Sequence, residues 1–174
     1  DRVYDSPVPA ELMDYIQKNK DSLLPEFQEN WKKAGSKTTG TWKEVFGEGF
    51  QSEEVFSAWH YAVYINEVAK AGQNEYPLPM YVNAWLRAPD WKPGHYPVGG
   101  PVAHMMDIWK CGAPAIALMA PDIYLSDFKG VCAEFTQQNN PLLIPEAQTD
   151  RDAAARAFWA IAEHDAIGFA PFGI

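Results

Sequence analysis

The sequence predicts a mixed α/β fold, in which four short parallel strands alternate with helices as in half of a (β/α)8 barrel (TIM barrel). Two observations carry this prediction. From residue 78 onward, short β-prone runs alternate with helix-like segments of about 10 to 15 residues, the pattern of βαβ units. The strand-like runs end in or near polar or aromatic side chains, where a parallel barrel builds its site. Residues 1–51 lack this rhythm and precede the barrel units of residues 52–174.

Residues 1–51 are predicted to form a helical and loop insertion. Pro9, at a first helical position, begins one helix, and Ser22 begins a second that ends at Gly35. Residues 36–51 are rich in Gly and Thr and are expected to form a long loop.

A strong amphipathic helix is predicted over residues 52–71, with apolar side chains at helical spacing and Gly72 as its stop. Four predicted strands follow, at residues 78–85, 115–124, 141–146 and 166–172. Helices are expected between them, over residues 102–111, from Ser126 to Phe135, and after a capping box formed by Thr149 and Asp152. Residues 88–101, rich in Gly and Pro, are expected to form a loop.

The order of these elements suggests a piece of a larger domain. The chain begins with helices and ends with a strand, and four parallel strands with two open edges are an unfavourable free-standing sheet. We therefore expect a further segment carrying the other half of the barrel as a partner.

Composition limits the function. The 174 residues carry a net charge of −9, which disfavours nucleic acid and anionic lipid as partners but allows a neutral sugar. No apolar run reaches the roughly 18 residues of a membrane span. Cys111 and Cys132, both in helical segments, are expected to be unpaired thiols.

The predicted strand ends supply the candidate site residues. They are Asn83, Trp85, Asp122, Tyr124, Glu146 and Phe172. Glu146 is the strongest candidate, since it follows an apolar run and stands where the core would open to a pocket. Retaining glycosidases need such a carboxylate, together with a second carboxyl group about 5 to 5.5 Å away.

Five sequence blocks, in order, resemble bacterial glycoside hydrolase family 35 β-galactosidases. They are residues 58–62 (AWHYA), 75–85 (EYPLPMYVNAW), 120–124 (APDIY), 143–146 (LIPE) and 164–172 (HDAIGFAPF). The resemblance covers nearly the whole chain and implies strands five to eight of a (β/α)8 barrel. It implies that Glu146 is the nucleophile and that Tyr124 orients its carboxylate. Asn83, Trp85 and Asp122 would contact the sugar, and Phe172, at the last strand end, is a further candidate substrate contact.

The acid/base Glu of that family follows an Asn at the end of strand four, and no segment of this sequence matches it. Asn66-Glu67 has the same dipeptide but lies within the helix of residues 52–71, so we expect Glu67 on a helix surface. Asn74-Glu75 is expected in a loop at the wrong end of its strand.

The remaining polar residues are weaker candidates. His95 and Tyr96 could line the pocket rim, but loop surface is the favoured interpretation. His60, His104 and His164 are expected to be structural, and no metal-ligand spacing, phosphate loop or dinucleotide motif is present, so no metal or cofactor is expected.

The function expected is therefore hydrolysis of terminal β-galactosides or related oligosaccharides by a retaining mechanism, with this segment inactive alone. Two alternatives stay open, a non-catalytic carbohydrate-binding or assembly fragment and a related barrel hydrolase with different sugar specificity. The resemblance favours a periplasmic or extracellular location.

Overall fold

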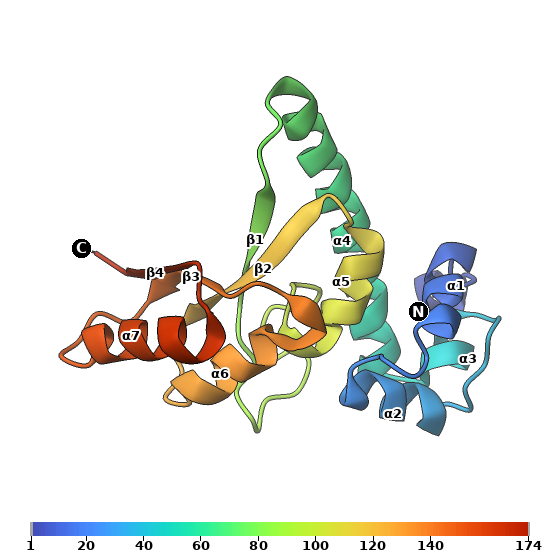
Figure 1. Ribbon diagram of the computed structural model, residues 1–174. Coiled ribbons are helices and arrows are strands. Elements are labelled where there is room, and N and C mark those ends of the chain that lie inside the picture. Colours follow the sequence, from blue (N-terminus) through green and yellow to red (C-terminus); the bar gives the residue numbers. More distant parts are fainter. Residues whose placement is uncertain (1, 174) are drawn as a thin grey trace.

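The computed structural model describes residues 2–173 and shows a mixed α/β fold with a four-stranded, all-parallel sheet (Figure 1). The strands follow one another in space in the order in which they occur in the sequence. They are β1 (Met80–Ala84), β2 (Ile116–Ile123), β3 (Leu143–Ala147) and β4 (Gly168–Pro171). All four predicted strands are confirmed, as is the α/β class.

Seven α-helices and three 3-10 turns complete the described part of the chain. The α-helices are α1 (Ala10–Lys18), α2 (Pro25–Lys33), α3 (Trp42–Phe46), α4 (Phe50–Glu75), α5 (Met106–Gly112), α6 (Phe128–Phe135) and α7 (Ala153–His164). The 3-10 turns are η1 (Arg2–Asp5), η2 (Ala103–Met105) and η3 (Gln137–Asn139). Among residues 2–173, no helix combines the length and apolar character required to cross a membrane.

The long helix α4 extends past both its predicted ends. Gly72 does not stop it; this glycine lies inside the helix, close to the Met80 side chain, and an added Cβ would come within 3.0 Å of Met80 Cε. The helix ends at Glu75, and Tyr76 is extended. Pro77 explains this position, since the residue before a proline disfavours helical backbone.

Helix α3 contradicts the predicted loop over residues 36–51. Its start is a complete capping box: the Thr41 side chain accepts from the Glu44 amide, and the Glu44 carboxylate accepts from the Thr41 amide. This T-x-x-E pattern was present in the sequence. The helix is short, but Trp42, Val45 and Phe46 are buried, so tertiary packing stabilises it.

Three predicted helix starts are wrong in detail. Ser22 lies in a turn before α2, which begins at Pro25 instead. Asp127 rather than Ser126 caps α6, by accepting from the Gly130 amide. The capping box at Thr149 does not form, because its hydroxyl donates to the Phe172 carbonyl and links the β3–α7 connection to the chain after β4.

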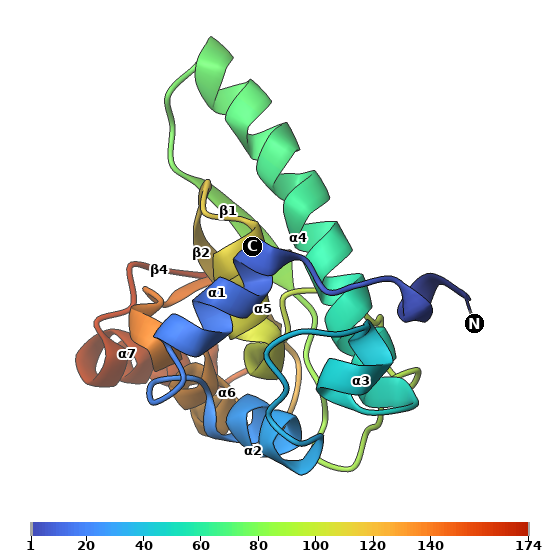
Figure 2. The same cartoon turned by 90° about the vertical axis from the view of Figure 1, so that its right-hand side faces the viewer.

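The N-terminal helices α1–α3 pack beside α4 and α5, on the side of the molecule away from β4 (Figures 1 and 2). Asp107 on α5 joins the two parts, since its carboxylate accepts from the Leu24 amide at 2.7 Å and from the Tyr15 hydroxyl at 3.5 Å. The insertion and the strands thus share one continuous core.

Asn140, in the connection before β3, takes the place of a strand neighbour for β2. Its buried side chain donates to the Met119 carbonyl at 2.9 Å and accepts from the Met119 amide at 2.9 Å. The registered pairs between β2 and β3 lie further along, at Asp122 with Glu146 and Ile123 with Ala147. Asn140 therefore stabilises the sheet where β2 has no registered β3 partner.

Candidate functional site

The candidate site lies at the carboxyl ends of β1, β2 and β3, as predicted. Asp122 on β2 and Glu146 on β3 are directly paired in the parallel register. Asn83 on β1 pairs with Ala120, two residues before Asp122. Because parallel strands end at the same edge, side chains that are 63 positions apart in the sequence come together here.

Glu146 accepts a short hydrogen bond from Tyr124. The distance from the Tyr124 hydroxyl to Glu146 Oε1 is 2.6 Å, and Tyr124 follows the last residue of β2. The hydrogen bond to Glu146, together with burial, raises the pKa of Tyr124 to about 12. The phenol therefore remains a neutral donor in ordinary conditions and fixes one oxygen of the carboxylate.

Asp122 is held by Asn83 on the neighbouring strand. Asn83 Nδ2 lies 2.9 Å from Asp122 Oδ1 and 3.2 Å from Oδ2, so the amide spans both oxygens. Burial raises the pKa of Asp122; the Asn83 hydrogen bond opposes this rise, and the nearby Glu146 charge adds to it. The site thus contains two carboxyl groups with different partners.

A cavity of about 100 Å³ opens beside these groups. Its lining residues are Trp85, Leu86, Trp91, Asp122, Tyr124, Leu125 and Glu146. Trp85 is 56% exposed and Trp91 38% exposed, so flat apolar rings face solvent next to the carboxylates. This combination suits a ligand with polar groups and an apolar ring face, such as a pyranose.

Five of the six predicted site residues gather here. Four of them line the cavity: Trp85, Asp122, Tyr124 and Glu146. The fifth, Asn83, does not line it but donates a hydrogen bond to Asp122. Phe172 is not among the lining residues; it lies after β4 and is 66% exposed. Its amide donates to the Ala147 carbonyl, so it continues the pairing of β4 with β3.

Trp91 was missed because it lies in the Gly- and Pro-rich loop rather than at a strand end. The candidates predicted in that loop were His95 and Tyr96, and the prediction of Tyr96 at the pocket rim or on the loop surface is wrong. Tyr96 is 4% exposed, and its hydroxyl donates to the buried Glu54, whereas His95 is exposed. A bulky aromatic in the loop that follows the first strand was the signal that could have identified Trp91.

The two look-alike glutamates lie outside the site. Glu67 is on the exposed surface of α4 and forms an ion pair with Lys70 at 2.9 Å, as expected of a helix-surface residue. Glu75 lies in the last turn of α4 rather than in the predicted loop, before the start of β1 and so at the opposite end of that strand.

The two cysteines are free, as predicted. Cys132 is buried and Cys111 half-buried, and burial raises the pKa of the Cys111 thiol to about 11. Neither thiol is activated for nucleophilic chemistry. Among residues 2–173, no three His, Cys, Asp or Glu side chains are grouped so that they could hold a metal ion.

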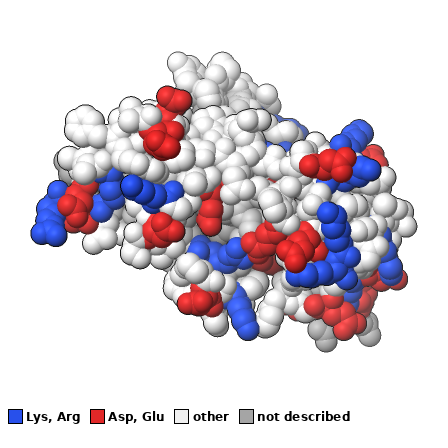
Figure 3. All heavy atoms as spheres, turned by 60° about the horizontal axis from the view of Figure 1, so that its bottom comes forward, with Lys and Arg blue, Asp and Glu red and all other residues white. Residues whose placement is uncertain are grey.

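Charge is mixed on the face shown in Figure 3, where basic side chains lie among acidic ones.

Comparisons with known proteins identify no family: no protein-family model matches the chain, and no curated protein matches it significantly. The geometry of the strand-end residues is therefore the basis for the functional proposal.

Proposed function

We propose that this chain is part of the catalytic domain of a retaining β-galactosidase, with Glu146 as its nucleophile. The observation that carries the proposal is the position of Glu146. It is the last residue but one of the parallel strand β3, its Oε1 accepts the Tyr124 hydroxyl at 2.6 Å, and it lines a cavity that Trp85 and Trp91 also line. The five blocks that resemble family 35 enzymes support the same assignment.

We further propose that β1–β4 are strands five to eight of a (β/α)8 barrel. The strictly sequential strand order supports this, because right-handed crossovers that advance in one direction place their helices on one face of the sheet. A doubly wound fold would reverse its order at a switch point. Tyr81 and Asn83 on β1 are exposed, which leaves a surface that the other barrel strands would cover.

In the proposed reaction, the Glu146 carboxylate forms an ester bond to the anomeric carbon while the glycosidic C–O bond breaks. An acid protonates the leaving oxygen, and water then attacks the anomeric carbon, releases Glu146 and returns its proton to the same group. Tyr124 holds the attacking carboxylate in one orientation. Neither Glu67 nor Glu75 can supply the acid, so the proposal assigns this role to the segment that completes the barrel.

The cavity side chains have distinct roles in this proposal. Trp85 and Trp91 stack on the apolar face of the sugar, while Asp122 and its partner Asn83 bind ring hydroxyls. Galactosides are proposed over other sugars on the resemblance alone. A panel of aryl glycosides that differ only in the configuration of the sugar decides this point.

The decisive experiment uses the full-length protein and a 2-deoxy-2-fluoro-β-galactoside with a good leaving group. The fluorine slows hydrolysis of the ester, so mass spectrometry should find the sugar on the peptide that contains Glu146. Glu146→Gln should lower turnover of an aryl β-galactoside by on the order of 10³-fold or more and abolish labelling. Glu67→Gln is the matched control and should leave both unchanged.

Full turnover in Glu146→Gln, or a label on another carboxylate, would refute the assignment. The non-catalytic alternative makes a different prediction: saturable binding of galactosides in isothermal titration, with no hydrolysis by the full-length protein. The observation that favours this alternative is the pair of Trp rings beside the carboxylates, because such rings can bind a sugar without cleaving it.

A further inference from the structure

The aromatic wall of the cavity stands on a loop without regular secondary structure. Residues 85–102 connect β1 to η2 and carry Trp85 and Trp91. The loop's own backbone hydrogen bonds span short turns, such as Trp91 N to the Ala88 carbonyl and His95 N to the Lys92 carbonyl. Such turns do not orient a loop relative to the sheet, so contacts from other elements must do so.

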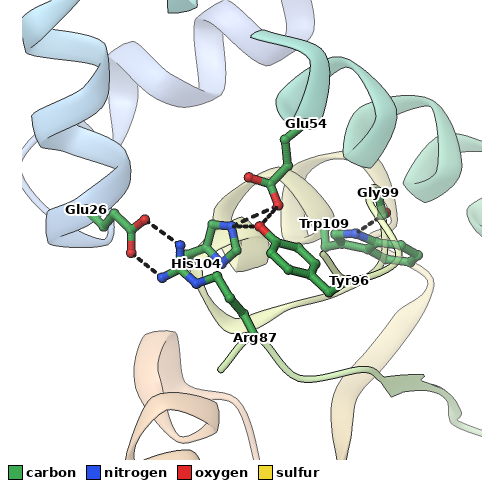
Figure 4. A network of polar contacts seen from close by, with 7 residues as sticks. All are labelled: Glu26, Glu54, Arg87, Tyr96, Gly99, His104 and Trp109. Carbon is green, nitrogen blue, oxygen red and sulfur yellow. Dashed lines mark hydrogen bonds and ion pairs between the residues drawn. The ribbon is translucent and has the colours of Figure 1, made fainter. Parts of the chain in front are cut away.

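The first such contact is made by Arg87, two residues after Trp85. Its guanidinium donates to both oxygens of Glu26 on α2, at 2.8 and 2.6 Å (Figure 4). A bidentate pair of this kind fixes distance and orientation together. The Glu26 hydrogen bond raises the pKa of Arg87, so the pair stays charged.

The second contact is made by Tyr96, five residues after Trp91. Its hydroxyl donates to Glu54 Oε1 at 2.6 Å, and the same oxygen lies 3.0 Å from His104 Nε2 on η2. Glu54, Tyr96 and His104 are all at most 8% exposed. Burial and the Glu54 carboxylate raise the pKa of Tyr96, which therefore remains a hydrogen-bond donor.

The third contact lies near the end of the loop, where Trp109 on α5 donates its indole N–H to the Gly99 carbonyl at 3.2 Å. Figure 4 shows that the three contacts come from α2, α4 and α5 and converge on one loop. None of the anchoring side chains lines the aromatic cavity. The same loop thus carries both the anchoring contacts and the two Trp side chains that line the cavity.

We propose that Glu26, Arg87, Glu54 and Tyr96 are positioning residues, which hold loop 85–102 so that Trp85 and Trp91 face the sugar bound beside Glu146. Through Glu26, the N-terminal helical insertion sets the affinity of a site that it does not touch. The identity of the ligand as a sugar rests on the proposed function, whereas the coupling between the network and the two Trp rings does not.

The test uses the full-length protein with 5-fluorotryptophan and 19F NMR, with the two resonances assigned by Trp85→Phe and Trp91→Phe. Glu26→Gln and Tyr96→Phe should shift or broaden both resonances, because each releases one anchor. Glu29→Gln is the control, since Glu29 is on the same helix but forms an exposed ion pair with Lys33, and it should leave both resonances in place. Tyr96→Phe perturbs a buried cluster, so the partly exposed Glu26 provides a second variant that tests the proposal if the first does not fold.

Kinetics supply the second readout. If Trp85 and Trp91 contribute only to binding the sugar, Glu26→Gln should raise KM for an aryl β-galactoside about 5- to 10-fold over that of the wild type. Its kcat should stay within about twofold of the wild-type value. Arg87→Gln should act similarly, and the double variant should be no worse than either single one, since both remove the same contact.

Unmoved Trp resonances in both variants would overturn the proposal, as would an unchanged KM alongside moved resonances. The 19F measurement is independent of turnover. An inactive wild-type protein would therefore count against the proposed function, while the effect of the anchors on Trp85 and Trp91 would still be decided.

Discussion

The Tyr124 hydroxyl and the Glu146 carboxylate, from the ends of adjacent strands, are joined by a hydrogen bond of 2.6 Å. Glu146 also stands in register with Asp122, so two carboxyl groups lie on adjacent strands at the same edge of the sheet. The two carboxyl groups have different hydrogen-bond donors: a phenol donates to Glu146, and an amide donates to Asp122. This difference in hydrogen bonding allows the two carboxyl groups to have different roles.

Removing the Tyr124 hydroxyl should impair the proposed chemistry without disrupting the fold. Tyr124→Phe is expected to lower kcat for an aryl β-galactoside roughly 10- to 100-fold, because Glu146 becomes free to rotate away from the anomeric carbon. Steady-state kinetics check this. Tyr64→Phe, at a 65% exposed position on α4, is the control, and equal activity of the two variants would contradict the orienting role.

Asp122 should make stability depend on pH. Its folded pKa is raised, mainly by burial, so the folded protein holds this proton more tightly than the unfolded chain. The free energy of unfolding should therefore fall as the pH rises from the unfolded pKa, about 3.9, through the folded pKa. Asp122→Asn should remove that decline in urea titrations at several pH values. The exposed Asp14→Asn is the control, and an identical pH slope in Asp122→Asn and the wild type would contradict the prediction.

Asn140 should be a large single contributor to the stability of the sheet. Asn140→Ala leaves the buried amide and carbonyl of Met119 without their partner, which is expected to cost about 2 to 4 kcal/mol. Denaturant unfolding measures the loss, and hydrogen exchange should accelerate at the Met119 amide. The exposed Asn74→Ala should change stability by less than about 0.5 kcal/mol.

The contact between α4 and α5 should not tolerate a methyl group at Gly112. An added Cβ would lie 2.9 Å from Ala62 Cβ and 3.5 Å from the backbone nitrogen of Val63, so the backbones of the two helices would have to move apart. Gly112→Ala should destabilise by about 1 to 3 kcal/mol despite the better helix propensity of Ala. Gly100→Ala, where the nearest atom would be 3.9 Å away, is the matched control. Thermal melts of both variants check this, and equal melting temperatures would contradict it.

The sequence by itself determined the alternation of strands and helices, the four strands and the position of Glu146 at a strand end. Each of these depends on local periodicity, and a parallel sheet brings its strand ends together whatever the details of the loops. The unpaired cysteines also followed from composition and spacing. The helix-surface position of Glu67 followed from its place inside a long apolar-periodic helix.

Only the tertiary structure decided what the irregular segments do. Helix α3 is too short to be stable without its buried side chains, and Trp91, in an irregular loop, lines the same cavity as the strand-end residues. Glu54 and Tyr96 are 42 positions apart and meet through the packing of α4 against that loop. Local patterns carry no information on such contacts, because the hydrogen bonds that fix them join residues distant in the chain.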